Sequence, residues 1–261
     1  MNPADPIVVV EGVSFAYGPG APSVLSGVSW RFRRSAVTAL LGPNGSGKTT
    51  LLNLILGWLT PASGRIMING REPASSTRRE WSRQVGFVPQ DEAPAFELEL
   101  GEHVLLGRAP HLALLERPGE ADRAAAAAAL ERTGLTALRD RAVHALSGGE
   151  RQLAAIARVL AQAPDVYLLD EPLSHLDLAN TRRILKILES IRKEGRTVIL
   201  TTHDPNIAAL VADEAILLRG GEIAAGGPPV DVLTEERLGF VYGVPVDVRM
   251  IEGRPVVLPR L

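Results

Sequence analysis

The eight residues GPNGSGKT, at positions 42–49, constrain the fold of this chain more than any other stretch. An apolar run at residues 36–41 precedes them and a leucine-rich run at residues 49–59 follows, which predicts a strand, a glycine-rich loop and a helix. Glycines let backbone N–H groups converge on an anion, and the N-terminus of the helix favours negative charge. With all eight positions and both flanking elements in place, the stretch predicts a phosphate-binding loop rather than a plain turn.

Two side chains of this phosphate loop (residues 42–49) have separate expected roles. Lys48 can reach the β- and γ-phosphates of a nucleotide, and the Thr49 hydroxyl can bind Mg²⁺, which takes few protein ligands beside phosphates and water. The predicted nucleotide-binding residues are Gly42, Pro43, Asn44, Gly45, Ser46, Gly47, Lys48, Thr49 and Thr50.

Acidic side chains stand at the end of a second apolar run, in VYLLDEP at residues 166–172. Ligands of parallel sheets bind at the carboxyl ends of the strands. Asp170 is therefore expected to hold Mg²⁺, and Glu171, facing the other way, to polarise an attacking water. The alternative is a carboxylate pair that only caps the next turn, which the neighbouring phosphate loop disfavours.

Two further polar residues also end predicted strands. The His203 imidazole can hydrogen-bond a γ-phosphate or the attacking water. The Gln90 amide can bind Mg²⁺ or contact that water. A structural histidine and an ordinary loop glutamine are the alternatives, and the strand-end positions favour the catalytic interpretation.

A second candidate anion site begins at Ser147, Gly148 and Gly149. Apolar residues recur from Leu153 at i, i+3, i+4 and i+7, so these three residues are expected to open a helix. Its first N–H groups lack helical partners and can bind an anion. The phosphate loop already supplies one such site, so the second needs a different explanation.

The composition excludes several classes of protein. The 261 residues include no cysteine, which rules out disulfides, thiolate metal sites and cysteine nucleophiles. The net charge of −2 disfavours general nucleic-acid binding. No apolar run reaches the length of a membrane span, and the N-terminus does not resemble a secretory signal. We expect a cytoplasmic protein, with any membrane span supplied by a partner.

Taken together, the motifs resemble those of the ATP-binding subunit of ABC transporters. A phosphate loop alone would indicate only a P-loop NTPase, whereas LSGGE some twenty residues before LLDEP is highly specific. The resemblance covers almost the whole chain, in the family's order: residues 42–49, Gln90, LSGGERQ at 146–152, LLDEP at 168–172, SHLD at 174–177 and His203.

The resemblance implies an α/β fold: a P-loop NTPase (RecA-like) core with a mainly parallel sheet, an antiparallel β subdomain and an inserted helical subdomain. Apolar runs that alternate with helical sequence independently favour the parallel sheet. The expected organisation is a single cassette over residues 1–261. Its parts are a nucleotide-binding core at 1–90 and 163–227, the helical subdomain at 91–162, and a C-terminal extension at 228–261.

The resemblance also explains the second anion site. It implies a head-to-tail homodimer with ATP and Mg²⁺ between the protomers. Ser147, Gly148 and Gly149 of one protomer then close over the γ-phosphate held by the other, and two-fold symmetry creates two such sites. Asp177 is expected at the dimer seam, and Tyr17 is expected to stack on adenine; its alternative is a core aromatic.

By the same resemblance, the segment around Gln90 and the helical subdomain form a groove for a helix of an integral membrane permease. This places the chain on the cytoplasmic face of the membrane. One departure is Leu153, where the family often carries an arginine. Two softer features, VLLGRAPHL at 104–112 and the tail at 238–259, are similar to ATPases of importers for iron-siderophore complexes, haem and cobalamin. A periplasmic or lipid-anchored binding protein would then deliver the substrate.

Other functions remain open from the sequence. ATPases for molybdate, zinc or manganese import, or for export, share much of the same pattern. A non-transport ABC ATPase usually carries two cassettes or a long coiled-coil insertion, which this chain lacks. A P-loop phosphotransferase is disfavoured by LSGGE and His203.

Overall fold

A six-stranded sheet forms the centre of the protein in this computed structural model, which describes residues 5–90 and 97–260. The strand order is β5-β6-β7-β3-β8-β9, and all neighbours are parallel except β8 and β9. The strands are β3 (Val37–Leu41), β5 (Val85–Val88), β6 (Val166–Leu169), β7 (Thr197–Thr202), β8 (Glu214–Arg219) and β9 (Glu222–Gly227).

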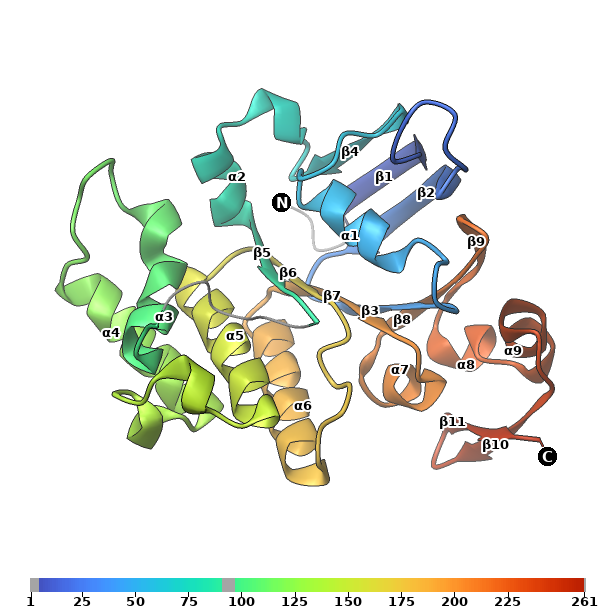
Figure 1. The fold of residues 1–261 in the computed structure, drawn as a ribbon. Helices are drawn as coiled ribbons and strands as arrows, with labels where there is room; N and C mark the ends of the chain where they lie inside the picture. Colours follow the sequence, from blue (N-terminus) through green and yellow to red (C-terminus); the bar gives the residue numbers. More distant parts are fainter. Residues whose placement is uncertain (1–4, 91–96, 261) are drawn as a thin grey trace.

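A three-stranded antiparallel sheet and two helices cover one face of the central sheet (Figure 1). The sheet has the order β2-β1-β4. Asn69 and Gly70 follow β4 with φ of 51° and 74°, as a tight turn with two left-handed residues requires. An isolated bridge between Ile68 and Arg71 closes that turn. The elements of this layer are β1 (Pro6–Phe15), β2 (Leu25–Arg33), β4 (Ser63–Ile68), α1 (Lys48–Ile55) and α2 (Arg78–Gln84).

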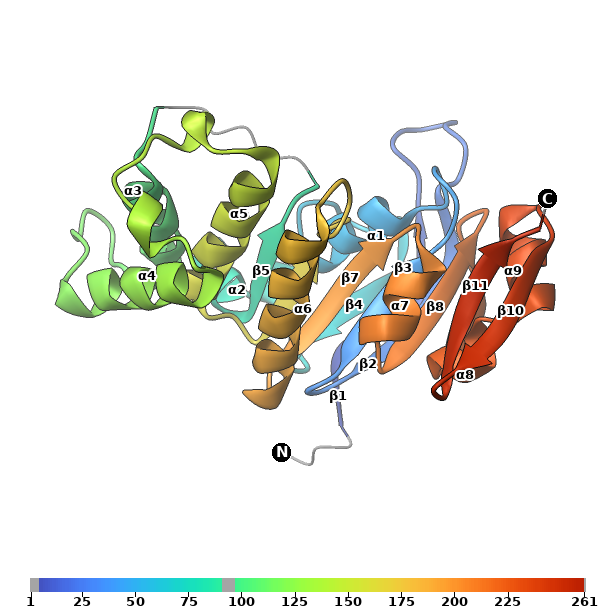
Figure 2. The same cartoon turned by 90° about the horizontal axis from the view of Figure 1, so that it is seen from below.

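Helices cover the other face of the central sheet (Figures 1 and 2). The helices over the sheet are α5 (Gly148–Gln162), α6 (Leu178–Lys193) and α7 (Pro205–Val211), whereas α3 (Leu100–Leu105) and α4 (Glu120–Thr133) pack against α5. Helices α3, α4 and α5 enter between β5 and β6, so the helical block interrupts the order of the strands. Short 3₁₀ turns are η1 (Pro73–Ser75), η2 (Leu106–His111), η3 (Thr136–Leu138) and η4 (Val143–Ala145).

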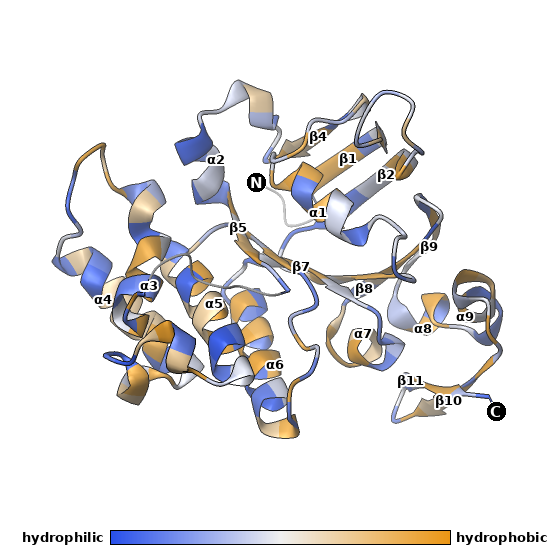
Figure 3. Ribbon diagram, viewed as in Figure 1, coloured by the Kyte–Doolittle hydropathy of each residue, from blue (hydrophilic) through white to orange (hydrophobic). Residues whose placement is uncertain are grey.

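Two apolar cores result, one on each face of the central sheet. In β3, Val37, Ala39 and Leu41 pack against the helical side, whereas Leu40 packs against the antiparallel sheet. Successive side chains of a strand point to opposite faces, so a strand buried on both sides is apolar throughout. Figure 3 shows this apolar character in the central strands.

The C-terminal part packs at the β8–β9 edge of the central sheet. Gly220 and Gly221 turn the β8–β9 hairpin with φ of 56° and 82°. Two short helices and a further hairpin follow. They are α8 (Pro229–Val232), α9 (Glu235–Tyr242), β10 (Val246–Ile251) and β11 (Arg254–Pro259).

The architecture confirms the expected fold class, a mainly parallel sheet with separate antiparallel strands and a helical block. None of the helices that the structure describes combines the length and apolar character needed to cross a membrane.

Candidate active site

An open cavity of about 390 Å³ lies where the central strands end. It brings together the phosphate loop, Gln90 just beyond the end of β5 and the two acidic residues after β6, which are far apart in the sequence. The lining residues are Tyr17, Val24, Asn44, Gly45, Ser46, Gly47, Lys48, Thr49, Thr50, Gln90, Asp170 and Glu171.

Two positions of the phosphate loop, Gly42 and Gly47, have a backbone conformation and surroundings that only glycine fits. Gly42 has φ of 153°, and a Cβ there would lie 2.3 Å from the Leu218 carbonyl oxygen. Gly47 has φ of 100°, and a Cβ there would lie 2.5 Å from the Leu25 side chain. Any side chain at these positions would force the loop away from the strands behind it.

Lys48, the first residue of α1, turns its ammonium group back over the loop. Nζ donates to the carbonyl oxygens of Gly42 at 2.8 Å and Pro43 at 3.2 Å. Burial lowers the pKa of Lys48, while the charges of Glu171 and Asp170 oppose that shift. A phosphate arriving in the loop would supply this ammonium group with an anionic partner.

Asp170 is buried at the end of β6 and accepts two hydroxyl hydrogen bonds. Thr49 Oγ1 donates to its Oδ2 at 2.9 Å, and Thr201 Oγ1 donates to its Oδ1 at 2.5 Å. Mg²⁺ prefers such oxygen ligands and usually keeps several waters. Within the described residues, no group of three or more His, Asp or Glu side chains is placed to hold a metal ion. The oxygens of Thr49 and Asp170, with Gln90 on the same cavity, fit an ion that also binds phosphate and water.

Glu171 points away from Asp170's partners and meets His203. Its backbone has φ of 48°, and its N–H donates to Thr201 Oγ1 at 2.8 Å. Glu171 Oε2 lies 2.9 Å from His203 Nδ1. The Glu171 side chain is 11% exposed and the His203 side chain 60% exposed, so the carboxylate is held inside while the imidazole faces outward. An ionised carboxylate only accepts, so Nδ1 donates in this contact.

Tyr17 forms the outer wall of the cavity and is not a core aromatic. The residue is 64% exposed, its hydroxyl lies 3.1 Å from Thr50 Oγ1, and its ring meets the Phe15 ring edge to face. The exposed ring is free to stack on a planar group.

The second candidate anion site lies on the other face of the sheet from α1, at the start of α5 (Figure 1). Ser147 Oγ accepts from Glu150 N, and Glu150 Oε2 accepts from Ser147 N at 2.7 Å, which is a capping box. Gly148 is exposed, and a Cβ on Gly149 would lie 2.5 Å from Asn180 Nδ2. Asp177 caps α6 nearby by accepting from Asn180 N at 2.7 Å.

Thr201 is a residue of this site that the sequence analysis misses. It is fully buried in β7 and holds Asp170 through Oδ1 and Glu171 through its backbone N–H. A polar residue within the apolar run TVILTT is the signal that could have indicated it.

Comparison with known proteins identifies the family of this chain. Residues 25–174 match the family model described as "ABC transporter". The chain belongs to the ABC transporter family. The match includes the phosphate loop and the residues after β5 and β6, and it makes the protein an ABC ATPase.

Relatives and solved structures agree with this family. A hemin import ATP-binding protein from Rhodococcus jostii is 38% identical over 97% of this chain and 87% of its own. The ferric enterobactin transport ATP-binding protein of Escherichia coli is 34% identical over 96% and 93%. Among solved structures, a metal-chelate type ABC transporter, in an inward-facing conformation, has a TM-score of 0.85 with 31% identity over 98% of both chains.

Proposed function

We propose that this ABC ATPase powers the uptake of a metal chelate, such as an iron-siderophore complex, haem or cobalamin. The observation that carries this proposal is the similarity, over nearly the whole chain, to import ATPases named for hemin and ferric enterobactin and to a metal-chelate type transporter. Within the cassette we assign a nucleotide-binding core to residues 1–90 and 163–227, a helical subdomain to 91–162 and a C-terminal extension to 228–261.

The phosphate loop and α1 hold the triphosphate of ATP in this proposal. Lys48 exchanges the carbonyls of Gly42 and Pro43 for phosphate oxygens, because an anion is the stronger partner for its charge. Tyr17 stacks on the adenine. Thr49 and Asp170 would hold Mg²⁺, with Gln90 beside them, and the ion would neutralise charge on the phosphates.

Glu171 is the general base for hydrolysis. Its carboxylate accepts a proton from water as the water oxygen bonds to the γ-phosphorus and the bond to the β-phosphate oxygen breaks. His203 orients that carboxylate through Nδ1, and in this proposal its imidazole also contacts the γ-phosphate. Because Thr201 holds the Glu171 backbone, the base is fixed before ATP arrives.

Two copies of the chain complete each other's sites in a head-to-tail homodimer. Ser147, Gly148 and Gly149 lie outside the cavity of their own chain, and the exposed start of α5 is available to a phosphate held by a partner. Asp177, at the start of α6, lies close to this helix end and belongs to the same seam. ATP closes this dimer and hydrolysis reopens it.

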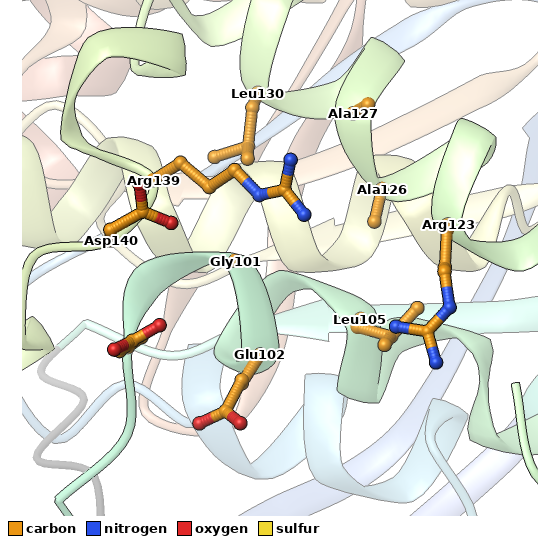
Figure 4. A pocket seen from close by; sticks show the side chains of 10 residues that line it. Gly101, Glu102, Leu105, Arg123, Ala126, Ala127, Leu130, Arg139 and Asp140 are labelled. Atoms are coloured by element: carbon orange, nitrogen blue, oxygen red, sulfur yellow. The ribbon is translucent and has the colours of Figure 1, made fainter.

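A membrane permease docks on the helical subdomain and converts this movement into transport, which places the ATPase at the cytoplasmic face of the membrane. A pocket of about 100 Å³ lies between α3, α4 and the turn after η3 (Figure 4). Glu99 and Glu102 come from the start of α3, Arg123 comes from α4 and Arg139 follows η3. A permease helix that carries both charge signs pairs with these side chains in this proposal. The rest of the expected groove, at 91–96, lies outside the described residues.

An uptake assay tests the proposal. A deletion strain carrying the parent gene should take up labelled haem, ferric siderophore or cobalamin, and a strain carrying Glu171→Gln should not. A periplasmic or lipid-anchored binding protein should be required as well. Uptake of all three chelates that is unchanged by the deletion would contradict the proposal.

A second candidate cargo is a different metal substrate. A cobalt import ATP-binding protein from Rhodobacter capsulatus is 39% identical over 88% of this chain and 81% of its own. Labelled cobalt, molybdate, zinc and manganese therefore belong in the same assay. Loss of the uptake of one of these ions in the deletion strain, with chelate uptake unchanged, would favour this alternative. Retention of a compound in the deletion strain but not in the parent would indicate export.

A further inference from the structure

Tyr242, the last residue of α9, connects the C-terminal extension to the active site. Its hydroxyl donates to the His203 carbonyl oxygen at 3.3 Å. The backbone of Gly42 lies close enough to this hydroxyl to lower its pKa. One side chain thus lies beside the start of the phosphate loop and hydrogen-bonds to the main chain of the histidine that contacts Glu171.

The Tyr242 hydroxyl lies beside the ends of two neighbouring strands, β3 and β7. Leu41 of β3 and Thr202 of β7 are paired neighbours at the ends of their strands. Gly42 and His203 are the next residues on each strand, and the chains then diverge into the phosphate loop and α7. The Tyr242 hydroxyl therefore lies beside both chains one step beyond their last pair and donates to the carbonyl of His203.

The surroundings keep this hydroxyl protonated. Burial raises the pKa of Tyr242 to about 12, the Gly42 backbone lowers it, and the charges of Glu171 and Asp204 raise it. The hydroxyl can therefore donate to His203 throughout the physiological pH range.

The C-terminal extension also contacts the chain just after His203, at Asn206. Asn206, in the first turn of α7, exchanges two hydrogen bonds with the Val257 backbone of β11, at 3.0 and 2.8 Å. Within α9, Leu238 and Val241 are buried, which fixes the helix that carries Tyr242. The chain from His203 to Asn206 is thus held from both the helix and the hairpin of the extension.

We propose that Tyr242 is a positioning residue for ATP hydrolysis. It fixes the His203 main chain against the first glycine of the phosphate loop, so that the imidazole reaches Glu171. The proposal rests on the catalytic role proposed above for His203. It makes the C-terminal extension part of the hydrolytic unit.

The kinetic test removes only the hydroxyl, with Tyr242→Phe in the full-length chain. We expect kcat to fall about three- to tenfold, the effect of one lost neutral hydrogen bond, with the Kd for ATP changed less than about twofold. Tyr167→Phe is the matched control, because that tyrosine is buried in β6 and its pKa is also raised to about 12. An unchanged kcat, or parallel losses of ATP affinity and thermal stability, would overturn the proposal.

A second measurement reports on His203 directly. The chain has five histidines, and His203→Ala identifies the imidazole C–H resonance of His203 by NMR. Tyr242→Phe should shift this resonance more than the other four, and Tyr167→Phe should not. A fall in kcat without this shift would overturn the proposal. If the resonance shifts but His203→Ala hydrolyses ATP at the parent rate, positioning by Tyr242 stands and the proposed role of His203 fails.

Discussion

Asp170 and Glu171 are adjacent in the chain, yet their carboxylates have different partners. Asp170 accepts hydroxyl groups from Thr49 and Thr201, whereas Glu171 meets His203. The left-handed backbone of Glu171, with φ of 48°, turns its side chain away, and Thr201 holds both residues. The two roles proposed here, a magnesium ligand and a base, depend on this divergence.

The substitution Glu171→Gln should leave ATP binding intact and stop turnover, because an amide cannot accept the proton from water. We expect phosphate release to fall roughly 100-fold or more. Size-exclusion chromatography with saturating ATP should show a stable dimer. Glu189→Gln, which alters an exposed carboxylate of α6, is the control and should behave like the parent. A Glu171→Gln protein that stays monomeric and hydrolyses ATP normally would mean that the base is another residue.

Lys48→Ala should weaken nucleotide binding itself. Hydrogen bonds to a charged group contribute about 1.5–3 kcal/mol, so the Kd for ATP should rise roughly 10- to 100-fold. Titration with a fluorescent nucleotide measures this, with Lys193→Ala, an exposed lysine of α6, as the control. Equal affinities of the parent and Lys48→Ala would contradict the assignment of the phosphate loop.

At the scale of elements, the first residues of a helix affect both its stability and its capacity to bind an anion. Thr77 of α2 and Ser147 of α5 both form capping boxes, with Glu80 and Glu150. The first four N–H groups of any helix lack helical partners, and such a box satisfies only some of them. The start of α5 carries two glycines, which leave its backbone accessible to an anion, whereas α2 begins with Arg78 and Arg79.

Ser147→Ala and Thr77→Ala therefore form a matched pair. Each removes a capping side chain and should lower the free energy of unfolding by about 1 kcal/mol. Only Ser147→Ala should also lower ATP hydrolysis, roughly 10-fold or more, since only Ser147 is proposed to contact a phosphate. Urea denaturation and phosphate release measure the two effects. Equal activities of the two variants would remove Ser147 from the site.

At the scale of the whole molecule, the start of α5 lies outside the cavity of its own chain, whose lining includes none of Ser147, Gly148 and Gly149. In the proposed head-to-tail dimer, the start of α5 of one chain meets the cavity of the other, and the symmetry generates two equivalent sites.

Mixing two impaired variants tests this arrangement. At an ATP concentration near the Kd of the parent, Lys48→Ala and Ser147→Ala should each hydrolyse ATP at about one-tenth of the parent rate or less when alone. In a mixed dimer, one site combines the intact Lys48 of one chain with the intact Ser147 of the other, so activity should rise above that of either variant. Phosphate release from the mixture, compared with each protein at the same total concentration, measures this. A mixture no more active than its components would contradict completion of the site by the partner.

Several elements were predictable because their signals are local. The buried strands followed from apolar runs, and the β8–β9 hairpin from its two glycines. The sequence analysis did not predict α2 or α7, although T-x-x-E at Thr77 and Asp-Pro at Asp204 are signals for helix starts. Both helices are only seven residues long, so apolar periodicity has little length in which to appear.

The sequence by itself determined the phosphate loop, the strand-end positions of Asp170, Glu171 and His203, and the family. Glycine patterns and apolar runs act over a few residues and need no distant partner. Only the tertiary structure decided that Thr201 holds both acidic residues and that Tyr242 reaches Gly42 and His203. Those contacts join residues far apart in the chain, and their geometry depends on how the strands align and how the C-terminal helices pack against them.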